Sequence, residues 1–157
     1  MQRLNHTTAS PEGYQKLLGV AAFLAHSGLD TNLLELISMR ASEINGCSWC
    51  LDYHSKHLRQ QGETEQRLYG LVAWKEAPYY TERERAALAW TEAVTLIADT
   101  HVPDEVYEEV RQQFSEQELA NLTMVLVAIN GWNRFAISFR DEAGTYQPAE
   151  PKVAATV

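Results

Sequence analysis

Residues 45–54 read Asn45-Gly46-Cys47-Ser48-Trp49-Cys50-Leu51-Asp52-Tyr53-His54, and they contain both cysteines of the 157-residue chain. The Asn-Gly pair stops a preceding helix, and the apolar residues after it return at helical spacing. This pattern predicts that Cys47 and Cys50 lie in the first turn of a helix. Unpaired backbone N–H groups and the positive end of the helix dipole favour an anion there. Because that position and the Cys-x-x-Cys spacing both lower the pKa of a thiol, we expect a reactive pair.

The cysteine pair has three other interpretations. Two small buried side chains would also fit, because free cysteine is among the most buried residue types. A zinc site needs four ligands in a tetrahedron, but the nearby candidates follow one another along one helix face of about 15 Å and cannot surround one ion. These candidates are Cys47, Cys50, His54 and His57. A c-type haem site needs histidine directly after the second cysteine, where this chain has Leu51. The sequence therefore predicts no metal and no organic cofactor.

A histidine and several carboxylates near the pair are candidates for proton transfer. His54 follows Cys50 by four residues, so it lies one turn further along the same helix face. A neutral imidazole there can take a proton from a thiol, directly or through water. The alternative is an ordinary surface histidine, an interpretation that also fits His57 and His101. Spacing alone does not single out one acidic partner among four carboxylates: Glu35, Glu43, Asp52 and Glu63.

The composition predicts a single soluble domain. Hydrophobic residues make up 45% of the chain, and the formal net charge is −8. This length allows one domain with a substantial core, and the acidic balance argues against a nucleic-acid partner. The first eleven residues lack the apolar run of a signal peptide, and the longest apolar run, residues 20–25, is too short to span a bilayer. We therefore expect a cytoplasmic protein, where a Cys-x-x-Cys pair serves redox or metal chemistry more often than structure.

Helical periodicity and capping signals divide the chain into about six to seven helices, and no segment alternates as a strand does. We therefore expect an all-α single domain with a core over about residues 30–140 and loose arms at 1–9 and 144–157. Two capping boxes, Thr81 with Glu84 and Ser115 with Glu118, begin two of the helices. The predicted helices span residues 11–27, 31–44, 48–61, 64–72, 81–99, 103–114 and 115–140.

Apolar residues in the last predicted helix cover much of its circumference. Such a helix must be buried on more than one side, and a subunit interface would supply the second partner, so we expect a homo-oligomer. Aromatic side chains form a further group, which fits either a pocket for an organic molecule or, more commonly, plain core. These are Trp49, Tyr53, Trp74 and Trp132.

Taken together, these motifs resemble the alkylhydroperoxidase D-like (AhpD-like) branch of the carboxymuconolactone decarboxylase-like superfamily. The specific part is the pattern from Cys47 through Cys50 to His54, with Glu35 upstream. The likeness extends over about residues 30–140. Supporting segments are residues 34–37, 42–50, 62–69, 82–90 and 129–134.

This resemblance implies an all-helical fold assembled into trimers or hexamers, and reduction of alkyl hydroperoxides by the thiol pair in antioxidant defence. By position, Cys50 resembles the peroxidatic cysteine and Cys47 the resolving cysteine. His54 resembles the proton-relay histidine, and Glu35, twelve residues before Cys47, resembles the relay glutamate. The implied partners are a small hydroperoxide and an external dithiol or disulfide-reductase donor, with no cofactor.

One position departs from the resemblance. The founding alkylhydroperoxidases carry a histidine between the two cysteines, where this chain has Trp49. The shorter relay leaves two alternatives open: a general dithiol oxidoreductase or redox sensor that uses the same pair, and a non-enzymatic oligomeric ligand-binding protein. The decarboxylases of the superfamily lack the cysteine pair, so decarboxylation is not expected.

Overall fold

The structure, a computed structural model, describes residues 1–149 of the chain. Regular structure in this part is entirely helical, as predicted, with nine α-helices and one 3₁₀ helix. Two four-residue helices, α1 and α7, bring the count above the predicted six to seven. In chain order the elements are α1 His6–Ala9, α2 Pro11–Leu24, α3 Thr31–Asn45, α4 Ser48–Gln60, α5 Glu65–Gly70, η1 Leu71–Ala73, α6 Glu82–Thr95, α7 Ile97–Thr100, α8 Asp104–Gln113 and α9 Glu116–Phe139.

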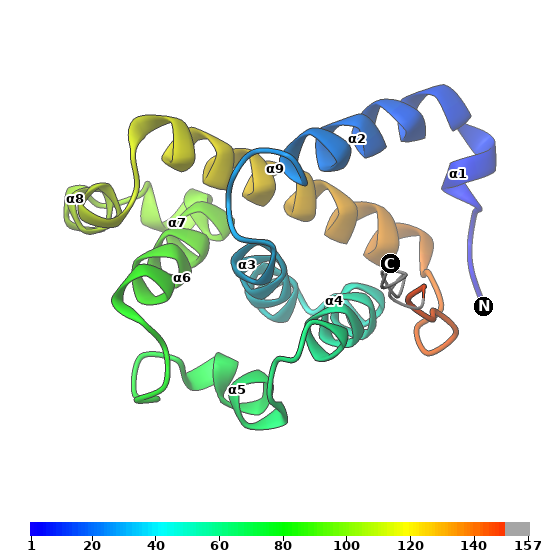
Figure 1. Ribbon diagram of the computed structural model, residues 1–157. Coiled ribbons are helices and arrows are strands. Elements are labelled where there is room, and N and C mark those ends of the chain that lie inside the picture. The colour runs from blue at the N-terminus through cyan, green and yellow to red at the C-terminus, as the bar shows by residue number, and fades with distance from the viewer. Residues whose placement is uncertain (150–157) are drawn as a thin grey trace, which may run out of the picture.

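Helix α3 lies at the centre of the fold and packs against α4, α6 and α9, while α2 runs beside α9 (Figure 1). The helix is buried on two sides. Ile37 belongs to the main core, which α2, α3, α6, α8 and α9 share. The next side chain back, Leu36, belongs to a second core, where Leu58 of α4, Leu71 and Leu88 are also buried. The central helix α3 therefore contributes side chains to both cores, which fixes its position in the fold.

Helix α9 is 24 residues long and apolar on more than one side. Leu122 and Leu126 are fully buried in the main core, whereas Met124 and Val127 are exposed. By length and composition it is the one helix among residues 1–149 that could cross a membrane. Its inner face nevertheless packs within the fold as the core helix of a globular domain does.

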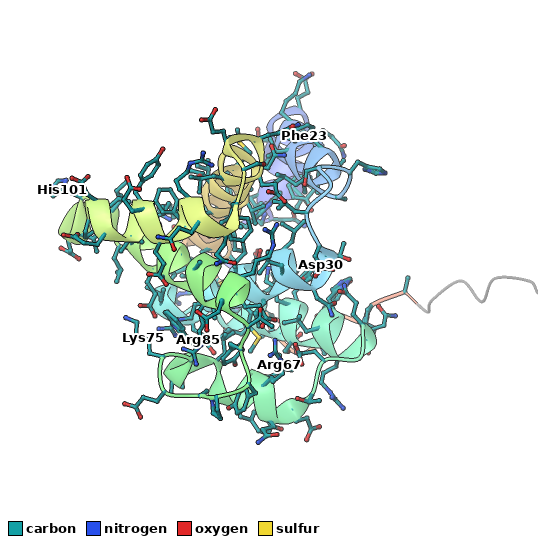
Figure 2. The ribbon with its side chains drawn as sticks, turned by 60° about the vertical axis from the view of Figure 1, so that its left-hand side comes forward. Phe23, Asp30, Arg67, Lys75, Arg85 and His101 are labelled. Atoms are coloured by element: carbon teal, nitrogen blue, oxygen red, sulfur yellow. A yellow bond between two sulfur atoms is a disulfide. The ribbon has the colours of Figure 1, made fainter. Side chains whose placement is uncertain are left out.

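Several helix starts follow directly from their capping residues. Both predicted capping boxes are present, at Thr81 with Glu84 and at Ser115 with Glu118. Asp30, which lies at the start of α3 (Figure 2), accepts a hydrogen bond from the backbone N–H of Leu33 at 2.9 Å. These side chains satisfy backbone donors that have no partner within the helix.

Other predicted boundaries were wrong. Helix α2 ends at Leu24 instead of residue 27, and Ser10 makes no side-chain capping bond, although Pro11 takes the first helical position as predicted. The predicted helix 81–99 is interrupted at Leu96, whose backbone leaves the helical region (φ −98°, ψ 32°), and a separate short helix, α7, follows. Helix α8 begins at Asp104, so Pro103 occupies the capping position instead of the first turn.

The segments predicted as loose arms make defined contacts where the structure describes them. The backbone N–H of Arg3 donates to the carbonyl of Phe139 at 2.8 Å, which holds the N-terminal segment beside the end of α9 (Figure 1). In the tail, the Gly144 N–H donates to Asp52 Oδ2 at 3.1 Å, and Lys56 Nζ donates to the carbonyl of Tyr146 at 2.7 Å. Residues 144–149 therefore follow α4, and the rest of the predicted arm, 150–157, lies outside the described residues.

Candidate active site

The turn between α3 and α4 positions the two cysteines. Gly46 ends α3 in the left-handed conformation (φ 70°) that glycine adopts without steric cost, and its N–H donates to carbonyls of the last turn. Cys47 is then the N-cap of α4, and its Sγ accepts from the backbone N–H of Cys50 at 3.3 Å. The two cysteines form a disulfide with their Cα atoms 5.3 Å apart. The predicted placement at a helix start is confirmed, with Cys47 capping the helix and Cys50 inside its first turn.

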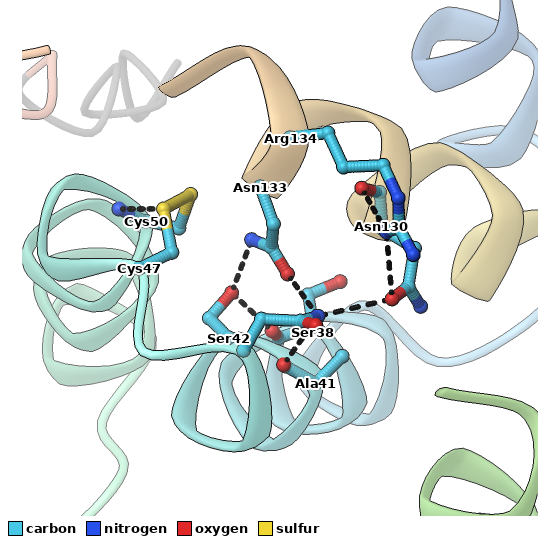
Figure 3. The surroundings of a disulfide bond; sticks show 9 residues. Ser38, Ala41, Ser42, Cys47, Cys50, Asn130, Asn133 and Arg134 are labelled. Carbon is cyan, nitrogen blue, oxygen red and sulfur yellow. Dashed lines mark hydrogen bonds between the residues drawn. A yellow bond between two sulfur atoms is a disulfide. The ribbon is translucent and has the colours of Figure 1, made fainter. Parts of the chain in front are cut away.

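Helix α9 holds this turn in place through a buried amide network (Figure 3). Asn45 Nδ2 donates to Asn133 Oδ1 at 2.8 Å, and Asn133 Nδ2 donates to Ser42 Oγ at 3.0 Å. The disulfide itself packs on Ala136. Each cysteine is only 1% exposed, so the open surface gives a reactant little access to the sulfurs.

Glu35 and His54 form a close pair across α3 and α4. His54 Nδ1 lies 2.6 Å from Glu35 Oε2, and both side chains are mostly buried. A carboxylate only accepts hydrogen bonds, so Nδ1 carries the proton that it shares with Glu35. The other ring nitrogen, Nε2, remains available to take or give a proton. This contact separates Glu35 from the other acidic candidates, which spacing alone did not do.

The three remaining carboxylates are each engaged by a basic side chain. Glu43 accepts from Arg40 Nη1 at 2.7 Å, and burial raises its pKa. A hydrogen bond from Lys56 to Asp52, at 2.9 Å, lowers the pKa of that carboxyl. Glu63 accepts from Arg67 Nε at 3.0 Å. In their places in the structure these three act as partners of cations, not of His54.

A cavity of about 300 Å³ connects the pair with the disulfide. Glu35, Cys50, Tyr53 and His54 all line it, whereas Cys47 does not. Of the two cysteines, Cys50 therefore shares the cavity with the Glu35–His54 pair. Apolar side chains from α2, α3 and α9 form most of the remaining wall, including Leu18, Leu24, Leu34, Val125, Ile129 and Trp132.

The four aromatic residues that the sequence singled out divide between cavity and core. Trp49, Tyr53 and Trp132 line the cavity. Trp74 instead lies in the second core, where its Nε1 donates to Glu92 at 2.8 Å. Within residues 1–149, no group of three or more His, Cys, Asp or Glu side chains is arranged to hold a metal ion.

Two tyrosines near the site were missed by sequence reasoning. Tyr14 lines the cavity from α2. Tyr146 lies over α4, with its hydroxyl 2.6 Å from His57 Nε2 and its ring 4.5 Å from that of Tyr53. His57, which fitted a plain surface histidine, is therefore half-buried in an aromatic contact. No periodic pattern marks the tail, so only the tyrosine itself could have pointed to this contact.

A comparison with protein families identifies the family of this chain. The model of the carboxymuconolactone decarboxylase family matches residues 9–93, which include both cysteines, Glu35 and His54. The chain belongs to the carboxymuconolactone decarboxylase family. Family membership extends over most of the chain, because the uncharacterized protein YdfG of Bacillus subtilis is 38% identical over 144 residues, which cover 92% of this chain and 98% of YdfG.

Two further relatives of this chain are connected by their descriptions with AhpD. The alkyl hydroperoxide reductase AhpD of Streptomyces coelicolor is 39% identical over 69 residues, covering 42% of this chain and 39% of that protein. A crystal structure of a protein of unknown function from Agrobacterium tumefaciens, suggested to be the antioxidant defence protein AhpD, is 41% identical. It superposes with a TM-score of 0.90 and covers 93% of this chain and 100% of that one. The fold is therefore AhpD-like.

Proposed function

We propose that this protein is a thiol-dependent hydroperoxide reductase in which Cys50 attacks the peroxide and Cys47 resolves the product. One observation carries the proposal: Cys50, and not Cys47, opens into the cavity that also contains the Glu35–His54 pair. A nucleophile beside a base that a third group orients is the usual arrangement for activating a thiol. The partial likeness to a named AhpD supports the same assignment.

In the first half-reaction, His54 takes the proton of the reduced Cys50 thiol, directly or through water, while Glu35 holds the imidazole. The thiolate attacks the terminal oxygen of ROOH, a sulfur–oxygen bond forms and the oxygen–oxygen bond breaks. Cys50 becomes a sulfenic acid, and the leaving RO⁻ takes the proton from His54 and departs as ROH. The sulfur is oxidised by two electrons, and the peroxide is reduced by two.

In the second half-reaction, the Cys47 thiolate attacks the Cys50 sulfur, and the sulfenic oxygen leaves with two protons as water. The product is the Cys47–Cys50 disulfide, a bond that the positions of these residues allow, since their Cα atoms are 5.3 Å apart. An external dithiol then supplies two electrons and two protons by thiol–disulfide exchange. No step requires a metal or an organic cofactor.

The burial of the pair favours this function over a general dithiol oxidoreductase or redox sensor. An oxidoreductase that exchanges disulfides with folded proteins must present a sulfur atom to its partner. Here both cysteines are 1% exposed, and the approach to Cys50 is an apolar cavity of about 300 Å³. A cavity of this size and apolar character suits a small organic peroxide and a small dithiol. We propose a homo-oligomer as the assembled form.

Steady-state consumption of cumene hydroperoxide with an excess of a small dithiol tests the proposal. We expect continuous turnover in proportion to protein concentration, and none when Cys50→Ser replaces the wild-type chain. A single round of thiol oxidation without turnover would instead identify a redox sensor. Thiols that neither oxidise nor alkylate near neutral pH would identify a ligand-binding protein. Either of these results would contradict the reductase proposal.

A further inference from the structure

The cavity contains a phenol that the proposed steps do not use. Tyr53 follows Cys50 by three residues on α4, so both side chains lie on the same helix face, and both line the cavity. The ring of Tyr53 is 5.1 Å from that of His54 and nearly perpendicular to it. The phenol is thus next to the base and on the same side of α4 as the sulfur.

Neighbouring rings hold Tyr53 firmly. Trp49 stacks on it at 5.4 Å with an interplanar angle of 19°. The rings of His57 and Tyr146 each lie 4.5 Å from it. Three aromatic partners leave the phenol little freedom to rotate, so its hydroxyl group has a fixed direction. Donors fixed in this way lose little free energy to reorganisation when charge develops nearby.

The hydroxyl of Tyr53 also stays protonated. Burial, with smaller contributions from Tyr146 and the carboxylate of Glu35, raises the pKa of Tyr53 above its ordinary value. A buried neutral phenol is a hydrogen-bond donor throughout the pH range in which a thiolate works.

We propose that Tyr53 is a further catalytic residue, whose hydroxyl donates a hydrogen bond to the leaving oxygen of the hydroperoxide. This inference rests on the proposed reductase function. When the thiolate of Cys50 attacks the terminal oxygen, negative charge develops on the other peroxide oxygen as the oxygen–oxygen bond breaks. Tyr53 stabilises that charge without transferring its own proton. The departing RO⁻ takes the proton that His54 received from the thiol, so the overall balance of the reaction is unchanged.

Two peroxides with different leaving groups test this role. Cumene hydroperoxide releases a strongly basic tertiary alkoxide, whereas peracetic acid releases acetate, a stable anion that gains little from a donor. The pre-reduced protein is mixed with each peroxide, and loss of thiols is followed in time, so that no reductant enters the measurement. For Tyr53→Phe we expect the rate constant with cumene hydroperoxide to fall by about tenfold to a hundredfold. The rate constant with peracetic acid should remain close to that of the wild type.

Tyr69→Phe is the matched control. This residue is 76% exposed on α5 and does not line the cavity. The variant loses a phenol hydroxyl group far from Tyr53, so both rate constants should remain at the wild-type level. Alkylation of Cys50 by iodoacetamide should also be unchanged in Tyr53→Phe, because thiolate formation depends on Glu35 and His54.

The outcomes separate this inference from the reductase function. If Tyr53→Phe slows both peroxides equally, or neither of them, Tyr53 does not act on the leaving group and the inference is wrong. The same conclusion follows if its alkylation rate falls with its peroxide rate, since the defect would then lie in the thiolate. If the wild-type thiols react with neither peroxide, the reductase proposal fails, and this inference fails with it.

Discussion

Glu35 is the residue on which the proposed acid–base chemistry depends. It comes from the middle of α3, and it meets His54 because the short turn at Gly46 makes α3 and α4 neighbours. At 2.6 Å the carboxylate fixes which ring nitrogen of His54 bears the shared proton. His54 lines the same cavity as Cys50. In the proposed mechanism, Glu35 holds the imidazole in the tautomer that can act as a base.

Replacing Glu35 by Gln should therefore slow the thiol chemistry. A carboxylate only accepts hydrogen bonds, whereas an amide also donates them, so glutamine does not hold His54 in one tautomer. We therefore expect the rate of Cys50 alkylation by iodoacetamide at neutral pH to fall by about tenfold or more. The matched control is Glu43→Gln, the same change on the same helix at a residue paired with Arg40. An equal loss in both variants, or no loss in Glu35→Gln, would contradict the role of the pair.

For individual residues, the sequence indicated the candidate side chains of the site, but it did not predict all the contacts that those side chains make. Cys47, Cys50 and His54 were evident from their spacing, because they lie within two turns of one helix. Glu35 was chosen over Glu43 only through the family resemblance, since it lies 19 residues from His54 and no local rule relates the two. The contact of Tyr146 was missed for the same reason, because its partner Tyr53 is far from it in the sequence.

Among the elements, the start of α4 matters most. Gly46 must adopt a positive φ for Cys47 to follow as the N-cap. We expect Gly46→Ala to lower the free energy of unfolding by about 1 kcal/mol, because an L-residue is strained there even though its Cβ would meet no neighbour. Urea denaturation of the oxidised protein measures this difference.

Gly19→Ala provides the opposite comparison. Gly19 is exposed within α2, its φ is not positive, and an added Cβ meets nothing within 4 Å. Alanine there should raise the free energy of unfolding by about 0.5–1 kcal/mol, because it is the better helix former. Stabilisation by both substitutions would mean that the left-handed cap at Gly46 is not required.

Helix boundaries were predictable where a side chain makes the cap. Thr81 and Ser115 each bond a backbone N–H in the first turn, and both starts lie where the sequence placed them. The break at Leu96 was not predictable, because no glycine or proline marks it. Periodicity continues through residue 99, but the chain leaves the helix at Leu96, and α8 then packs against α6.

At the scale of the whole molecule, the outer face of α9 has no partner among residues 1–149 of the same chain. Val127 is 61% exposed and Met124 43% exposed. Exposed apolar residues at the end of α6 and the start of α7, Leu96 and Ile97, extend this face. They are close to α9, because Asn130 Nδ2 donates to Thr95 Oγ1 at 3.2 Å. An exposed apolar face of this kind on a globular domain is typical of a subunit interface.

Sedimentation equilibrium tests that interface. The wild-type protein should sediment as an oligomer heavier than the 17.8 kDa chain, and Val127→Asp should shift it toward the monomer, because a charge would be buried on assembly. Val72→Asp is the matched control, since Val72 is 66% exposed on η1, away from α9. A wild-type monomer, or equal effects of the two substitutions, would rule out an interface through α9.

The sequence predicted the all-α class and most of its helices because helical periodicity is a local signal. It did not predict how α2 and α9 enclose the cavity, since that depends on packing between residues more than 100 positions apart, such as Tyr14 and Trp132. The cysteine turn could therefore be predicted from the sequence, whereas the shape of the cavity beside it could not.

In the proposed mechanism the peroxide oxidises Cys50, and trapping of the sulfenic acid in single-cysteine variants tests this assignment directly. Reduced Cys47→Ser and Cys50→Ser are each treated with one equivalent of cumene hydroperoxide in the presence of dimedone and analysed by mass spectrometry. We expect the dimedone adduct on Cys50 in Cys47→Ser, and no adduct in Cys50→Ser. An adduct on Cys47 with none on Cys50 would reverse the roles of the two cysteines and contradict the proposed mechanism.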